Sequence, residues 1–243
     1  MLEELKGLDP EWSMSDNMKV IGGAIKLLDE GKAPSESELY DLVKAKLKGA
    51  EDYFERPLDD PEIYSMLSRV AKKMNDSDME AKANRQINVY KANELEFLGR
   101  QQQFYGNNVK AAEYYRQALE LVPDHELAVS SLEKAQKRLD KSNDNLEKLE
   151  DKADRKGDNK SHIDLGKAYM DLGRVDDALD CFDMALENDE NDIDALTRLG
   201  MALESQGKFK ESLEYFDRAM EIKPTAMTAK RGKNYALYNL GEL

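Results

Sequence analysis

Apolar and small residues recur every three or four positions across residues 92–226, which is the spacing of one face of an α-helix. The first such stretch ends at Gly106, and a second stretch begins a few residues later and stops before Pro123. Glycine favours the left-handed backbone of a helix end, and proline prevents a helix from continuing. The pattern therefore predicts two short helices joined by a tight turn, with these inward positions: Leu95, Leu98, Gly99, Ala111, Tyr115 and Ala118.

The same arrangement returns twice further along the chain. Gly99 precedes Gly166 by 67 positions, one short of two such periods, so a degenerate unit is expected between them. A two-helix unit cannot bury its apolar face alone, and the stacking of neighbouring units supplies a shared core. Matching residues lie 34 positions apart in these pairs: Leu165 and Leu199, Gly166 and Gly200, Gly173 and Gly207, Phe182 and Phe216, Ala185 and Ala219.

The order Leu-x2-Leu-Gly, Gly, Ala-x3-aromatic-x2-Ala and Pro resembles the tetratricopeptide repeat family. Residues 92–125 and 193–226 carry the pattern well. Residues 159–192 depart from it, because His162 replaces a large apolar residue and Glu190 replaces the proline. The resemblance implies an all-α fold, a right-handed superhelical array of antiparallel helix hairpins.

The remaining segments carry weaker signals. Residues 126–158 are predicted to form a degenerate repeat-like hairpin that breaks near residues 141–145, and the alternative is one long helix. Helical patterns also cover residues 15–30 and 35–54, and residues 61–74 and 77–90 are expected to pair as a hairpin. The predicted divisions are an N-terminal helical segment (1–57), a diverged repeat-like hairpin (58–91), repeats at 92–125, 159–192 and 193–226, the degenerate hairpin (126–158), and a C-terminal capping helix (227–243).

Composition narrows the function classes. Of the 243 residues 35% are charged, and the net charge of -14 counts against a nucleic-acid partner because a phosphate backbone would be repelled. No apolar run approaches the roughly 18 residues that cross a bilayer, so no membrane partner is expected. Cys181 is the single cysteine, which indicates a reducing, cytoplasmic setting.

The sequence offers few candidates for catalysis. His125 falls in a turn between units and is interpreted as a solvated loop residue, and His162 falls at an inward helix position and is interpreted as a satisfied packing residue. Cys181 precedes a packing aromatic residue and is expected to be inert. The acidic stretch from Asp189 lacks the glycine and glutamate of a calcium loop. We therefore predict no enzyme, no metal and no cofactor.

The resemblance also implies where a partner binds, because in this family the first helix of each unit lines the concave side of the array. Three cations, Lys167, Arg198 and Arg231, fall near the middle of successive inner helices and predict a row that contacts a short acidic peptide. Methionine and tyrosine are adaptable contact residues and occur nearby. The predicted groove consists of Lys167, Arg198, Arg231, Met170, Met201, Tyr235, Tyr238, Lys134 and Arg100.

A second interpretation treats these cations as ordinary surface charges that pair with Asp164, Asp171 or Glu204. Exposed pairs of this kind contribute only about 0–1 kcal/mol. Some relatives use a lysine and asparagines at fixed positions to hold the carboxylate end of chaperone tails. This chain lacks that set, so chaperone-tail binding is not expected.

Two function classes follow from these observations. The first is a protein-interaction scaffold that binds a protein or peptide segment, partly acidic, in the concave groove. The alternative is a self-assembling structural protein, and hence a homo-oligomer, because repeat arrays with short caps can stack end to end. An enzyme with its site in residues 1–91 is a third idea, and no residue there resembles one.

Overall fold

The computed structural model describes residues 75–242 without a gap. Ten earlier residues are also described: Gly23, Lys26, Glu30, Gly31, Tyr64, Ser65, Ser68, Arg69, Ala71 and Lys72. The chain divides into two compact units, Met1–Asn93 and Glu94–Leu243. The helices predicted at 15–30, 35–54 and 61–74 lie largely outside the described residues.

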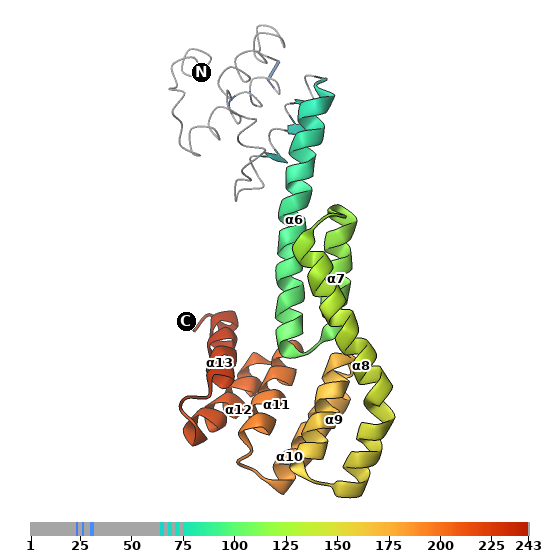
Figure 1. The fold of residues 1–243 in the computed structure, drawn as a ribbon. Coiled ribbons are helices and arrows are strands. Elements are labelled where there is room, and N and C mark those ends of the chain that lie inside the picture. The colour runs from blue at the N-terminus through green and yellow to red at the C-terminus, as the bar shows by residue number, and fades with distance from the viewer. Residues whose placement is uncertain are drawn as a thin grey trace. The chain divides into compact units, whose positions relative to one another are not determined.

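Residues 75–242 form helices and contain no strand (Figure 1). This confirms the predicted all-α class. The helices are α6 (Ser77–Tyr105), α7 (Asn108–Leu121), α8 (Glu126–Lys156), α9 (Asn159–Asp171), α10 (Val175–Asn188), α11 (Ile193–Ser205), α12 (Phe209–Ile222) and α13 (Met227–Leu240).

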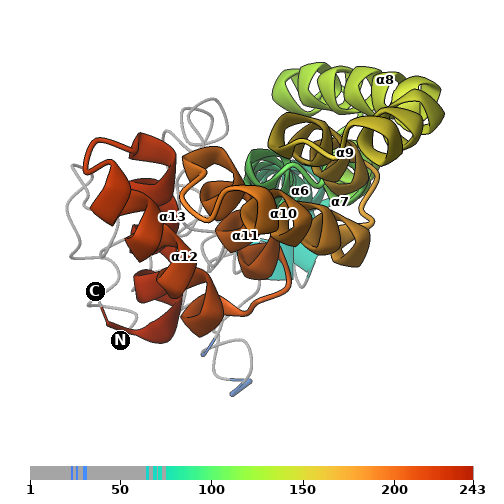
Figure 2. The same ribbon diagram turned by 90° about the horizontal axis from the view of Figure 1, so that it is seen from below.

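The second unit is a helical repeat array. Each helix from α7 to α13 packs against the next one in the chain, and α11 also packs against α9 and α13 (Figure 2). Tight turns separate the helices, and two of them carry Gly173 and Gly207 at φ of +71° and +76°, a region that side chains rarely adopt. The chain therefore builds stacked antiparallel hairpins around a shared core.

A close approach between a glycine and an aromatic ring holds each hairpin together. A Cβ on Gly166 would lie 2.5 Å from the Phe182 ring, and a Cβ on Gly200 would lie 2.7 Å from the Phe216 ring. Gly232 of α13 approaches Phe216 as well. Both rings are fully buried, so the helix backbones meet at the distance that the missing side chains allow.

Residues 126–158 differ from the preferred prediction. A hairpin there is wrong, and the alternative of one long helix is correct, since α8 runs unbroken over 31 residues to Gly157. Residues 141–145 contain no glycine or proline to stop it. Two of their polar side chains also have partners in the helical arrangement: the Asn145 amide donates to the Lys141 carbonyl at 2.7 Å, and the Ser142 hydroxyl donates to the Asp171 side chain of α9 at 2.7 Å.

The predicted boundary between residues 91 and 92 lies two residues from the division of the chain into compact units after Asn93, but no helix ends there. The structure shows α6 continuing through it as one helix of 29 residues. No glycine or proline lies between Ser77 and Leu98, so nothing in that stretch ends a helix. The first helix of the 92–125 unit is therefore the C-terminal part of a longer one.

The turn between α6 and α7 packs onto the later repeats. Tyr105 shares a core cluster with Met201, and its ring centroid lies 5.7 Å from that of Tyr235. The Arg231 guanidinium lies over the neighbouring Phe104 ring, with its Cζ atom 4.3 Å from the ring centroid. The chain's own turn thus occupies part of the surface formed by α11 and α13.

The close approach at Phe216 leads to a stability prediction. Substituting Gly200→Ala places a methyl group against a fully buried ring that Gly232 also contacts, so we expect a loss of about 1–3 kcal/mol in the free energy of unfolding. In an uncrowded helix the same change stabilises by up to about 1 kcal/mol. Urea denaturation measures the difference. In the double variant with Phe216→Leu the cost of the added methyl should shrink; additive effects would contradict the crowding.

Candidate functional site

A pocket opens where the end of α6 meets α8, α9 and α11. Its volume is about 630 Å³. Two carboxylates line it, Asp164 and Asp171, and both have partners within the protein. The cationic side chains in the lining are more numerous: Arg138, Lys141, Lys148, Lys152, Lys167 and Arg198.

A second pocket of about 550 Å³ adjoins the first. The two share Gln103, Phe104, Arg138 and Lys141. No acidic residue lines the second pocket. Its remaining lining residues are Arg100, Lys134 and Lys137. The two pockets form a continuous basic groove on a protein whose net charge is -14.

Most of the charge in the groove comes from one face of α8. We call Lys134, Arg138, Lys141, Lys148 and Lys152 the basic stripe. They follow one another at intervals of four, three, seven and four residues, which keeps them on a single face of the helix. The acidic residues of α8 line neither pocket. The continuity of α8 is what aligns these charges.

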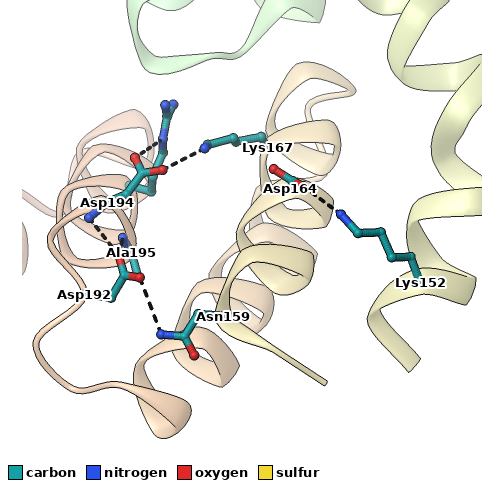
Figure 3. A network of polar contacts seen from close by, with 8 residues as sticks. Lys152, Asn159, Asp164, Lys167, Asp192, Asp194 and Ala195 are labelled. Carbon is teal, nitrogen blue, oxygen red and sulfur yellow. Dashed lines mark hydrogen bonds and ion pairs between the residues drawn. The ribbon is translucent and has the colours of Figure 1, made fainter. Parts of the chain in front are cut away.

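Most of the basic stripe is unpaired. Lys152 forms an ion pair with Asp164 at 2.9 Å (Figure 3). Among the residues that the structure describes, no carboxylate pairs with the other four members. Four positive charges therefore face the groove without an ion pair to this part of the chain, although the charge of Arg138 also acts on Asp171.

The two inner cations Lys167 and Arg198 share one carboxylate. Lys167 Nζ lies 2.7 Å from Asp194 Oδ2, and Arg198 Nε lies 3.1 Å from Asp194 Oδ1 (Figure 3). Burial opposes ionisation of Asp194, but the hydrogen bonds and charges of the two cations lower its pKa. Lys167 and Arg198 are therefore paired, as the second interpretation of the sequence expected. Their partner is Asp194, which was not among the expected acids Asp164, Asp171 and Glu204.

The third predicted cation, Arg231, lies apart from the other two. Together with Arg100 and Tyr235 it lines a pocket of about 520 Å³ beside α13. Phe104 and Tyr105 line both this pocket and the first one, so the α6–α7 turn separates Arg231 from Lys167 and Arg198.

The other predicted groove residues are divided in the same way. Met170 and Met201 line the first pocket, and each is only 4% exposed. Lys134 lies in the second pocket and Tyr238 outside all three, with 73% of its surface exposed. The sequence-based prediction did not include Arg138, Lys141, Lys148 and Lys152, although their intervals of three, seven and four residues place them on one helix face. The assumed turn near residues 141–145 would have separated them onto two helices.

A half-buried carboxylate connects the helices around the first pocket. Asp171 of α9 accepts hydrogen bonds from the Asn108 amide at the start of α7 and from the Ser142 hydroxyl in α8. Burial raises the pKa of Asp171, while these hydrogen bonds and the charge of Arg138 act in the opposite direction. The contact fixes α8 against α9 and hence positions the basic stripe relative to Lys167.

The carboxyl group of Glu204 is buried and has no hydrogen-bond partner among the described residues. The residue is 4% exposed. Burial raises the pKa of Glu204 to about 8. The side chain is therefore mostly protonated at neutral pH, which avoids the cost of an unpaired buried charge.

The candidates for catalysis lie outside the basic groove. His125 lies in the predicted turn between units, is partly exposed, and also caps α8, its Nδ1 accepting the Ala128 N–H at 3.2 Å. The Nδ1 atom of His162 is buried without a hydrogen-bond partner, so the predicted satisfied packing residue is only packed. Burial raises the pKa of Cys181 to about 11, so the thiol is protonated at neutral pH.

Among the described residues, no group of three or more histidine, cysteine or acidic side chains is placed to hold a metal ion. No helix in the same part of the chain combines the length and the apolar character needed to cross a membrane.

Comparison with known proteins supports the fold. Residues 163–226 match the family model described as tetratricopeptide repeat. Superkiller protein 3 of Saccharomyces cerevisiae is 32% identical over 66 residues, which are 27% of this chain and 5% of that protein. This chain thus aligns with only a small part of that relative.

Solved structures are also similar at low identity. The crystal structure of MamA protein is 20% identical, covers 63% of this chain and 84% of its own, and gives a TM-score of 0.40. The structure titled as YrrB, a TPR protein with an unusual peptide-binding site, is 18% identical, covers 87% and 97%, and gives a TM-score of 0.38.

The buried Glu204 leads to a prediction about pH. The folded chain keeps a proton that the unfolded chain releases above its ordinary pKa of 4.5, so this residue lowers the free energy of unfolding as pH rises from about 4.5 to about 8. Glu204→Gln should remove that decline and stabilise the fold by a few kcal/mol at pH 9, with little effect at pH 4. Urea denaturation across this range measures it. Glu211→Gln, at an exposed position of α12, is the control, and a decline that persists in the Glu204 variant contradicts the assignment.

Proposed function

We propose that this chain is an interaction scaffold, as the tetratricopeptide repeat match over residues 163–226 suggests, and that it holds an acidic segment of a protein partner in the basic groove. The observation that carries the proposal is the set of four unpaired cations on α8: Lys134, Arg138, Lys141 and Lys148. Surface cations without carboxylate neighbours are hydrated, and a partner that supplies carboxylates gains charge-assisted hydrogen bonds.

The total charge of the chain favours a short acidic segment over a nucleic acid. Screening at physiological salt limits each interaction to about 8 Å, so a peptide in the groove responds to the local cations. A nucleic acid extends beyond the groove and meets the rest of a chain whose net charge is -14.

The groove also provides apolar contacts. Phe104 and Leu149 line the first pocket and are partly buried. A partner segment that mixes carboxylates with apolar side chains uses both features, because the apolar contacts add affinity and the charges give specificity. The proposal needs no catalytic group, and the single buried cysteine is consistent with the reducing cytoplasm.

The proposal predicts the effect of reversing charges in the groove. Arg138→Glu with Lys141→Glu should weaken binding of an acidic peptide about tenfold or more, because two attractive charges become repulsive. The probe is a fluorescein-labelled peptide whose glutamates recur every three or four residues, and fluorescence anisotropy measures its affinity. Binding to the unmodified chain should also weaken as salt is added.

A matched control separates the groove from net charge. Lys210→Glu with Lys230→Glu changes the net charge by the same amount at two exposed positions that line none of the three pockets described above. This variant should keep the affinity of the unmodified chain. Equal losses in both variants, or no binding to the unmodified chain, would show that the basic groove is not the binding site.

A further inference from the structure

A row of acidic side chains follows the outer face of α10. Asp176, Asp180, Asp183 and Glu187 are all exposed and lie at intervals of four, three and four residues. They share one face of the helix for the same reason that the basic stripe does. We call these four residues the acidic stripe. The exposed side chain of Met184 lies among them and is 48% accessible.

The acidic stripe lacks cationic partners. Asp176 accepts a hydrogen bond from the neutral Gln206 amide at 2.7 Å. None of the four carboxylates forms an ion pair with another described residue. Burial raises the pKa of Asp183, and the charges of Asp180 and Glu187 add to the effect. These carboxylates repel one another, and a cationic surface placed against them would relieve the repulsion.

The two stripes complement each other in spacing as well as in sign. The intervals of four and three residues between Lys134, Arg138 and Lys141 repeat those between Asp176, Asp180 and Asp183. At 1.5 Å per residue the acidic stripe is about 16 Å long and the basic stripe about 27 Å long. The acidic stripe therefore fits within the length of the basic one, and two helices side by side can bring opposite charges together.

Within one molecule the basic stripe lines the groove, while the acidic stripe is exposed and lines neither of its two pockets. We propose that the acidic segment held in the basic groove is the α10 face of a second copy of this chain. The inference rests on the proposed function, because it uses the same groove and names its occupant. Each copy offers one groove and one acidic stripe, so the contact is head to tail.

A head-to-tail contact has consequences for assembly. Two different surfaces meet, so an open chain of copies keeps one free groove and one free acidic stripe at its ends, and a closed ring keeps neither. The contact is formed mainly by exposed ion pairs, which are individually weak and screened by salt. Assembly should therefore rise with protein concentration and be lost at high ionic strength.

Light scattering coupled to size exclusion, over a concentration series at low salt, tests the proposal. The mean molar mass of the unmodified chain should increase at least about twofold, and should return to that of a monomer near 1 M salt, where the screening length is about 3 Å. A strict monomer at every concentration in low salt would overturn the inference.

Two charge-reversed variants identify the surfaces. The groove variant carries Arg138→Glu, Lys141→Glu and Lys148→Glu, and the α10 variant carries Asp180→Lys, Asp183→Lys and Glu187→Lys. Each should remain monomeric alone, because two like-charged surfaces face each other. An equimolar mixture should assemble again, because each groove then meets a stripe of opposite charge. Recovery in the mixture also shows that both variants are folded.

The outcomes separate this inference from the proposed function. If the α10 variant assembles as the unmodified chain does, or if the mixture stays monomeric while circular dichroism shows both variants folded, the second copy is not the occupant. If the unmodified chain is also monomeric but binds the acidic peptide through Arg138 and Lys141, the proposed function stands and its partner is another protein. If neither assembly nor peptide binding occurs, both fail.

Discussion

The continuity of α8 determines how the rest of the repeat unit is arranged. A helix that runs unbroken from Glu126 to Lys156 packs its first half against α7 and its second half against α9, so it joins the first hairpin to the later repeats. The tip of the α6–α7 hairpin, with Phe104 and Tyr105, packs against α11 and α13. The same continuity aligns the basic stripe on one face, so the groove and its charge have a common structural origin.

Two carboxyl groups of this unit, Asp171 and Glu204, compensate for their removal from water in different ways. Asp171 is surrounded by donors from α7 and α8, and these keep its charge tolerable while they connect three helices. Glu204 has no such donors, and its raised pKa of about 8 means that it is buried as a neutral acid. The first arrangement fixes the helices that form the groove. Glu204 lowers the free energy of unfolding as pH rises. Its carboxyl group interacts with Tyr105, which lies at the end of α6 beside the α6–α7 turn.

The repeats were predictable because their determinants are local in sequence. A glycine and an aromatic residue 16 positions apart, such as Gly166 and Phe182 or Gly200 and Phe216, record a close helix contact in the spacing itself. The full lengths of α6 and α8 were not the preferred prediction. Both helices are long because no glycine or proline lies at the expected breaks, whereas the 34-residue period suggested a turn within each stretch. The pairing of Lys167 was missed for another reason. Its partner Asp194 belongs to a different hairpin, 27 residues away, and only the stacking of α9 on α11 brings the two together.

Charge on this protein matters by its distribution more than by its sum. Acidic and basic residues alternate along α8 in sequence, but on the helix the cations that line the groove share one face. Four of the five acidic residues of α10 similarly share one face. Over the screening length in cells, about 8 Å, a partner responds to the face that it touches and not to the net charge of -14. A chain that is acidic as a whole can therefore attract an acidic segment to its basic stripe. A chain that also presents an acidic stripe can attract a second copy of itself.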